Sequence, residues 1–140
     1  MTRDDLKQIY HITREIKKRE AQLSELRELT GAKAQRLTGM PRGGNISDET
    51  GNAATRLLDL EMILLGEKKK LEMAKAEVIL FISQIEDSYI RRIVEYRHYD
   101  LLPWKEIADL MGGRATTVSI RKTYSRWIRE ALPDEHRTNE

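Results

Sequence analysis

The sequence predicts an all-α fold, in which a long antiparallel, coiled-coil-like helical hairpin is followed by a smaller three-helix domain. Charged residues make up 34% of the 140 residues and hydrophobic ones 39%, with a single Phe and two Trp. Bulky apolar side chains for a large globular core are therefore scarce. Apolar residues instead recur at spacings of three and four along two long segments. Beyond Asp87 they form three short groups that Pro and Gly separate.

The first helix is expected over residues 3–29, with Thr2 or Asp4 as its N-cap. Its apolar residues fall at positions a and d of a heptad: Ile9, Ile12, Ile16, Leu23 and Leu26. Arg19 interrupts one d position. Because charged residues flank this narrow stripe, the helix is expected to bury one seam against a single neighbouring helix.

A break follows in residues 30–46, which hold four of the eight Gly and one of the three Pro. The sequence MPRGGN within it predicts a Gly-rich basic loop near 39–46. Ser47 or Asp48 then offers an N-cap for a second helix that continues to about Glu86. Residues 1–86 are thus expected to form the hairpin.

Two apolar bands of the second helix are wider than one seam requires: MILL at 62–65 and VILFI at 78–82. We expect them to make residues 1–86 an oligomerisation module, giving a homodimer or a higher homo-oligomer. The alternative is that these bands only pack on the C-terminal domain.

Residues 87–132 are expected to form three helices, from DSYIRRIVEYRHYD, LPWKEIADLM and TTVSIRKTYSRWIREAL. Pro103 sits at a helix start, and Gly112 and Gly113 end that helix. Ala108 permits close approach of two helices, and Ile120 anchors the last helix. A helix, a short Gly turn and a second, basic helix form the pattern of a helix-turn-helix. Residues 133–140 form a polar tail.

The net charge of +2 is uninformative, but its distribution is not. Residues 112–130 carry five basic side chains against Glu130 alone. The exposed side of the last helix is expected to contact double-stranded DNA. An Arg side chain can read guanine or hold a phosphate, and the short hydroxyl side chains of Ser and Thr can reach phosphates or base edges. The alternative is an ordinary solvated basic face. The candidate contacts are Arg114, Thr116, Thr117, Ser119, Arg121, Lys122 and Arg126.

Two further basic residues are candidate contacts to the DNA backbone, Arg42 in the loop and Lys105. For the loop, the simpler interpretation is a flexible connection between the two long helices.

Enzymatic chemistry has little support. The chain has no Cys, its three His lie far apart, and it contains no HExxH or comparable spacing. We therefore expect no catalytic activity, no metal and no cofactor. No apolar run is long enough to span a membrane and the N-terminus lacks a secretion signal, so a cytoplasmic location is expected.

LLPWKEIADLMG, followed by a basic helix, resembles region 4 of bacterial sigma factors. Nearly the whole chain is similar to small prophage proteins of the ArpU and RinA type, through MPRG at 40–43, Tyr96 and Arg97, and Trp104 with EIA at 106–108. The turn GGRATT departs from the sigma pattern, being longer. The resemblance implies a regulator of late phage genes that acts in the cytoplasm of a bacterial host.

The expected function is thus sequence-specific binding of double-stranded DNA by a phage or prophage transcriptional regulator. Small terminase subunits of phages also join a helix-turn-helix to oligomerising helices, which leaves recognition of packaging DNA as one alternative. The other is an adaptor that binds RNA polymerase without reading DNA.

Overall fold

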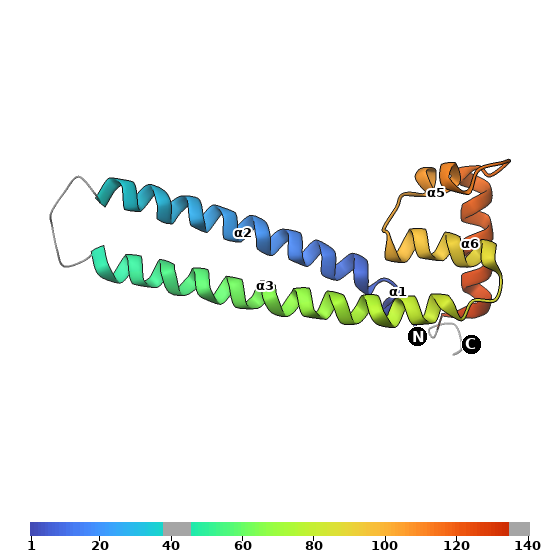
Figure 1. Ribbon diagram of the computed structural model, residues 1–140, viewed down its shortest axis with the longest axis horizontal. Helices are drawn as coiled ribbons and strands as arrows, with labels where there is room; N and C mark the ends of the chain where they lie inside the picture. The colour runs from blue at the N-terminus through green and yellow to red at the C-terminus, as the bar shows by residue number, and fades with distance from the viewer. Residues whose placement is uncertain (38–45, 135–140) are drawn as a thin grey trace. The chain divides into compact units, whose positions relative to one another are not determined.

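The computed structural model describes residues 1–37 and 46–134, with side chains over 1–31 and 51–134. These residues contain helices and no strand, which confirms the predicted all-α class (Figure 1). The elements in order are α1 (Arg3–Leu6), α2 (Gln8–Leu37), α3 (Ile46–Ser83), α4 (Ser88–Val94), the π-helix η1 (Glu95–Tyr99), α5 (Trp104–Met111) and α6 (Thr117–Ala131).

The chain divides into two compact units. The first unit comprises Met1–His11 and the chain from Leu71 onward, and the second comprises Ile12–Lys70. Helices α2 and α3 contribute residues to both.

The predicted N-terminal helix is interrupted after one turn. The Thr2 hydroxyl accepts a hydrogen bond from the Asp5 backbone N–H, and the Asp5 carboxylate accepts one from the Thr2 N–H. This capping box starts α1. Lys7 then ends it, with its N–H shared between the Arg3 and Asp4 carbonyls. Leu6, at the end of α1, is fully buried.

Helix α2 extends to Leu37, past the end expected at residue 29. The reason is local: KAQRL at 33–37 consists of strong helix formers, so the helix continues after the apolar seam stops. Helix α3 begins at Ile46 and ends at Ser83, so the expected start at Ser47 or Asp48 and the expected end near Glu86 were slightly misplaced. The predicted loop near 39–46 and Arg42 lie outside the described residues.

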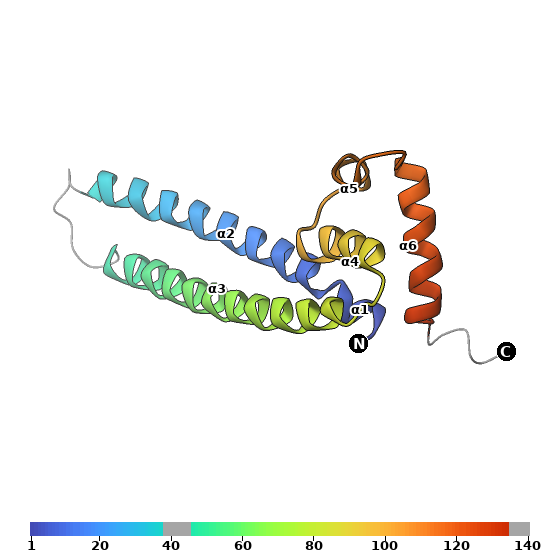
Figure 2. The ribbon, with the colours of Figure 1, turned by 45° about the vertical axis from the view of Figure 1, so that its right-hand side comes forward.

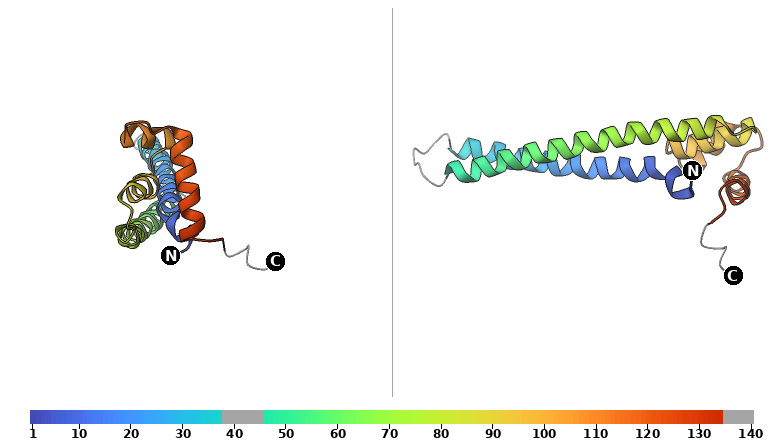
Figure 3. Two further views of the ribbon diagram at one scale, coloured as in Figure 1. Left: turned by 90° about the vertical axis from the view of Figure 1, so that its right-hand side faces the viewer. Right: turned by 90° about the horizontal axis from the view of Figure 1, so that it is seen from below.

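In the second unit, α2 and α3 run antiparallel (Figure 3, right). Arg27 pairs with Glu61 at 2.9 Å, and Glu20 pairs with Lys68 at 3.8 Å, so residues later in α2 meet residues earlier in α3. Apolar side chains form the seam between them, with Ile16, Leu23 and Leu64 buried.

The seam contains one polar layer at Arg19, the residue that interrupts the heptad. Its Nε lies 3.4 Å from Oε1 of the buried Glu67, and its Nη1 donates to Gln22. The second carboxylate oxygen of Glu67 is buried without a hydrogen-bond partner among the described residues. A polar layer of this kind fixes the register of two helices, because any shift would bury an unpaired charge.

In the first unit, α4, α5 and α6 pack around Ile93, Ile107, Ala108 and Ile120 (Figure 2). The Asp87 carboxylate caps α4 by accepting hydrogen bonds from the backbone of Tyr89 and Ile90. Pro103 is the N-cap of α5, so the helix begins at Trp104, one position after the expected start at Pro103.

The wide apolar bands of α3 are only partly covered. In the first band Leu64 is buried, but Met62 and Leu65 are 72% and 57% exposed. The second band lies in the first unit, where Val78 and Ile82 are buried and Phe81 contacts the ring of Trp127. Packing on the C-terminal helices therefore accounts for much of the second band.

Candidate nucleic-acid interface

The turn between α5 and α6 depends on two glycines with positive φ. Gly112 ends α5 with φ 67° and ψ −168°, and Gly113 follows with φ 63°. A side chain strains such backbone, most of all at Gly112, whose combination of angles is nearly restricted to glycine. The Ala115 N–H donates to the Gly112 carbonyl at 3.2 Å and closes the turn. The two glycines thus set the direction in which α6 leaves α5.

The start of α6 is fixed by a second capping box. The Thr116 hydroxyl accepts from the Ser119 N–H at 3.1 Å, and the Ser119 hydroxyl accepts from the Thr116 N–H at 2.9 Å. The helix therefore begins at Thr117, with Thr116 as its N-cap. The GGRATT turn therefore ends at Thr116, and the helix follows directly.

The inner side of α6 is anchored along its length. Ile120 is fully buried in the core of the three short helices. The Tyr124 ring lies 4.9 Å from that of Trp104, and its hydroxyl lies 2.6 Å from Nε2 of His98. Burial raises the pKa of Tyr124 to about 12, so this hydroxyl keeps its proton at neutral pH.

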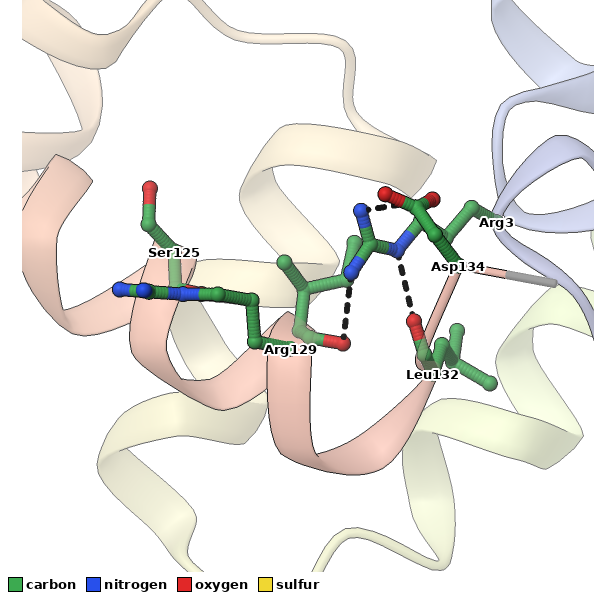
Figure 4. A network of polar contacts seen from close by, with 6 residues as sticks. Arg3, Ser125, Arg129, Leu132 and Asp134 are labelled. Atoms are coloured by element: carbon green, nitrogen blue, oxygen red, sulfur yellow. Dashed lines mark hydrogen bonds and ion pairs between the residues drawn. The ribbon is translucent and has the colours of Figure 1, made fainter. Parts of the chain in front are cut away.

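The C-terminal end of α6 is held by Arg3 from the start of the chain (Figure 4). The guanidinium Nε donates to the Leu132 carbonyl at 2.6 Å, and Nη1 lies 3.0 Å from the Asp134 carboxylate. A cation beside the last carbonyls of a helix also opposes the negative end of the helix dipole. Both ends of α6 are therefore fixed within the first unit.

The outer side of α6 forms a shallow basic groove of about 490 Å³. Four cations line it, Arg121, Lys122, Arg126 and Arg129, and no carboxylate does. Val118, near the first turn of the helix, is 62% exposed in the same groove. An exposed apolar side chain at the helix start beside cations is suited to the thymine methyl group and the phosphates of a DNA major groove.

The structure brings some of the predicted contacts together and separates others. Arg121, Lys122 and Arg126 lie exposed in the groove with the half-buried Thr117. The hydroxyls of Thr116 and Ser119 form the helix cap. Their contact with DNA stays a prediction. Arg114 lies exposed in the turn, and Lys105 lies exposed on α5.

Sequence reasoning omitted Val118, Ser125 and Arg129 from the candidate contacts. All three share the groove, and their spacing of seven and four residues identifies one helix face. Val118 was missed because an apolar residue is by default assigned to the core. The Arg129 Nε donates to the Ser125 carbonyl at 3.2 Å, so this guanidinium lies along the helix (Figure 4).

No group of three or more His, Asp or Glu in the described part of the chain has the geometry to hold a metal ion. None of the helices within residues 1–37 and 46–134 is long and apolar enough to cross a membrane.

Comparisons with protein-family models, curated proteins and solved structures find no match to this chain. The functional argument therefore depends on the chain's own residues.

Proposed function

We propose that this protein binds double-stranded DNA through the outer side of α6 and acts as a phage or prophage transcriptional regulator. The observation that carries the proposal is the α6 groove, which joins four cations, no carboxylate and an exposed Val118. The prophage context comes from the sequence resemblance alone.

The geometry of α6 suits a major groove. At 1.5 Å per residue its 15 residues span about 22 Å, and the major groove, about 12 Å wide, admits one helix. With the N-terminal turn toward the base edges, Val118 and Arg121 are the base-reading residues. Lys122, Arg126 and Arg129 are then assigned to phosphates, which set affinity and orientation.

The regulator acts as a dimer in this proposal, because one helix reads only a few base pairs. Leu58, Met62 and Leu65 form an exposed apolar face of α3 in the second unit. The same stretch is acidic at Asp59 and Glu61 and basic at residues 68–70. A two-fold axis beside Leu65 places the acidic part of one copy against the basic part of the other, so a second copy fits this face.

The test is fluorescence anisotropy with random duplex DNA over a series of salt concentrations. If Lys122, Arg126 and Arg129 each neutralise one phosphate, a dimer makes six phosphate contacts, and log K falls with log salt with a slope of about −5. Arg126→Ala should reduce that slope by about two in the dimer, one per copy. Lys17→Ala, which removes an exposed cation of α2, is the matched control and should leave the slope unchanged.

Base reading is tested with an operator selected from random sequences. Arg121→Ala should weaken operator binding by about 1 to 3 kcal/mol and binding to random DNA by less. Equal losses on both would remove Arg121 from base reading. Absence of binding even at low salt refutes direct DNA recognition, and co-purification with RNA polymerase would then favour the adaptor.

The mass in solution tests the assembly. Light scattering should give twice 16.3 kDa for the native chain. Leu65→Glu should give a monomer, because it places two like charges beside the proposed two-fold axis. Ser24→Glu, an exposed change on α2, should leave the dimer intact. A ring-sized mass would favour the small terminase function instead.

A further inference from the structure

A second concave surface lies in the first unit, and its lining shares no residue with the α6 groove. It is a cleft of about 600 Å³ between the N-terminal segment, η1, α5 and the inner side of α6. Its walls include Lys7, Arg97, Trp104 and Tyr124. None of these residues lines the α6 groove, so the proposed DNA contact leaves the cleft unused.

The cleft is cationic. Arg3, Lys7, Arg97 and two histidines line it, and no carboxylate does. The Arg3 guanidinium is committed to Asp134 and to the end of α6. Lys7, which is exposed, and Arg97 are therefore the cations best placed for a ligand. Burial, and to a lesser extent the charges of Arg97 and Lys7, lower the pKa of His98 to about 4, so His98 is neutral at pH 7.

The cleft also presents flat aromatic surfaces. The Trp104 and Tyr124 rings lie 4.9 Å apart at an interplanar angle of 58°, and Tyr10 contributes a third ring to the lining. The Arg97 guanidinium lies 4.5 Å from the centre of the Trp104 ring and donates to the Leu102 carbonyl. A fixed cation thus lies over one face of the Trp104 ring.

The backbone around the cleft is irregular in two places. Leu101, which lines the cleft, has φ 58° and is the one non-glycine residue with positive φ among those described. Arg97 and His98 belong to η1, a π-helix. Strained residues and π-helical turns both concentrate at functional sites, because they cost free energy that packing alone does not recover.

We propose that this cleft binds a small aromatic anion, with a nucleoside monophosphate as the ligand class that fits its lining. The phosphate lies between Lys7 and Arg97, which match its charge and its hydrogen-bond acceptors. The base packs on Trp104 and Tyr124. The volume of about 600 Å³ is within the usual range of small-molecule sites.

The sequence offers a direct readout, because it has only two tryptophans and only Trp104 lines the cleft. In a Trp127→Phe variant, Trp104 is the sole indole and its fluorescence reports on the cleft. Titration with adenosine monophosphate should quench it to saturation. Adenosine and inorganic phosphate should each bind at least tenfold more weakly, because each lacks one of the two recognised parts.

Charge dependence is tested by Lys7→Gln, an exposed change that leaves the aromatic walls intact. It should weaken binding of the monophosphate about tenfold and leave binding of adenosine unchanged. Lys17→Gln on α2 is the matched control and should behave like the parent. Saturation-transfer NMR of the monophosphate with the native chain provides a second measurement, in case Trp127→Phe does not fold.

Three results would overturn the proposal: quenching that does not saturate, equal affinity for adenosine and its monophosphate, or the same loss in Lys7→Gln and Lys17→Gln. Strictly competitive displacement of the monophosphate by duplex DNA, with no ternary complex at any concentration, would also overturn it, by making the cleft a DNA phosphate contact. Monophosphate binding by a chain that fails to bind DNA would support the cleft and refute the proposed function, so the two fail separately.

Discussion

Acid should destabilise this protein through His98, and the magnitude follows from the burial of that residue. His98 is 7% exposed, and its Nε2 lies 2.6 Å from the Tyr124 hydroxyl. Burial is the largest cause of its low pKa, followed by the charges of Arg97 and Lys7, while a hydrogen bond to the Leu6 backbone acts in the opposite direction. The pKa falls from 6.5 to about 4.

The sign follows from proton binding in the two states. The unfolded chain takes up a proton on His98 below about pH 6.5, but the folded chain does so only below about pH 4. Stability is therefore lost as the pH falls from about 6.5 to about 4. A pKa difference of about 2.5, at 1.36 kcal/mol per pKa unit, corresponds to a loss of about 3 kcal/mol.

Urea unfolding followed by circular dichroism at pH 7 and at about pH 4.5 measures this loss. The native chain should lose about 2 to 3 kcal/mol over that interval, and His98→Gln should lose much less. His11→Gln is the matched control, because it removes the exposed histidine of the same cleft and should leave the pH dependence unchanged. Equal pH dependence in the native chain and His98→Gln would refute the reasoning. Going no lower than about pH 4.5 limits the contribution of Asp5, whose pKa lies below its ordinary value because of hydrogen bonds to Thr2.

Three further predictions concern particular contacts, each measured by urea unfolding. Gly112→Ala should destabilise the folded protein by about 1 to 3 kcal/mol, because position 112 has a positive φ. Gly31→Ala, in open space on α2, should stabilise the fold by up to about 1 kcal/mol. The reverse order would contradict the turn geometry. Arg19→Leu should lower the free energy of unfolding by about 1 to 3 kcal/mol, because it leaves the Glu67 carboxylate unpaired. The double variant with Glu67→Leu should recover most of that stability. Additive losses in the double variant would exclude a shared polar layer. Thr116→Ala should cost about 1 kcal/mol, and Thr116→Ser should be nearly neutral because it retains the capping hydroxyl; equal costs would argue against the cap.

The sequence predicted helices well wherever the spacing of apolar residues agreed with the Gly and Pro residues that interrupt helices. The all-α class follows from the spacing of apolar residues, and the end of α5 follows from Gly112, whose positive φ needs glycine. The end of α2 was misplaced because its apolar seam ends before the run of strong helix formers at residues 33–37. Lys7 breaks the first helix although neither Gly nor Pro is present, so no local signal marked that break.

The candidate interface was predictable in its charges but not in its detailed roles. A helical wheel finds Arg121, Lys122 and Arg126 on one face from spacing alone. The capping box, in contrast, depends on the backbone conformation at Thr116, which decides whether a hydroxyl faces the helix end or solvent. The exposure of Val118 depends on which face the core leaves open. The cleft was not foreseen, because its residues come from segments that only the fold brings together.

Helix α6 is the one element shared by the α6 groove and the cleft, which makes a coupling between them measurable. Tyr124 faces the cleft and Arg121, one turn earlier, faces the groove. If the two ligands influence each other through α6, thermodynamic linkage requires that each changes the other's affinity by the same factor. If saturation with adenosine monophosphate changes the Kd for DNA tenfold, saturation with DNA must change the Kd for the monophosphate tenfold. A factor of ten corresponds to a coupling free energy of about 1.4 kcal/mol. Anisotropy and Trp104 fluorescence measure the two separately. Unequal factors would show that the two measurements do not report the same pair of binding equilibria, as when one ligand occupies a second site. A factor of one in both would show that α6 is held too firmly by Ile120 and Arg3 to transmit the change.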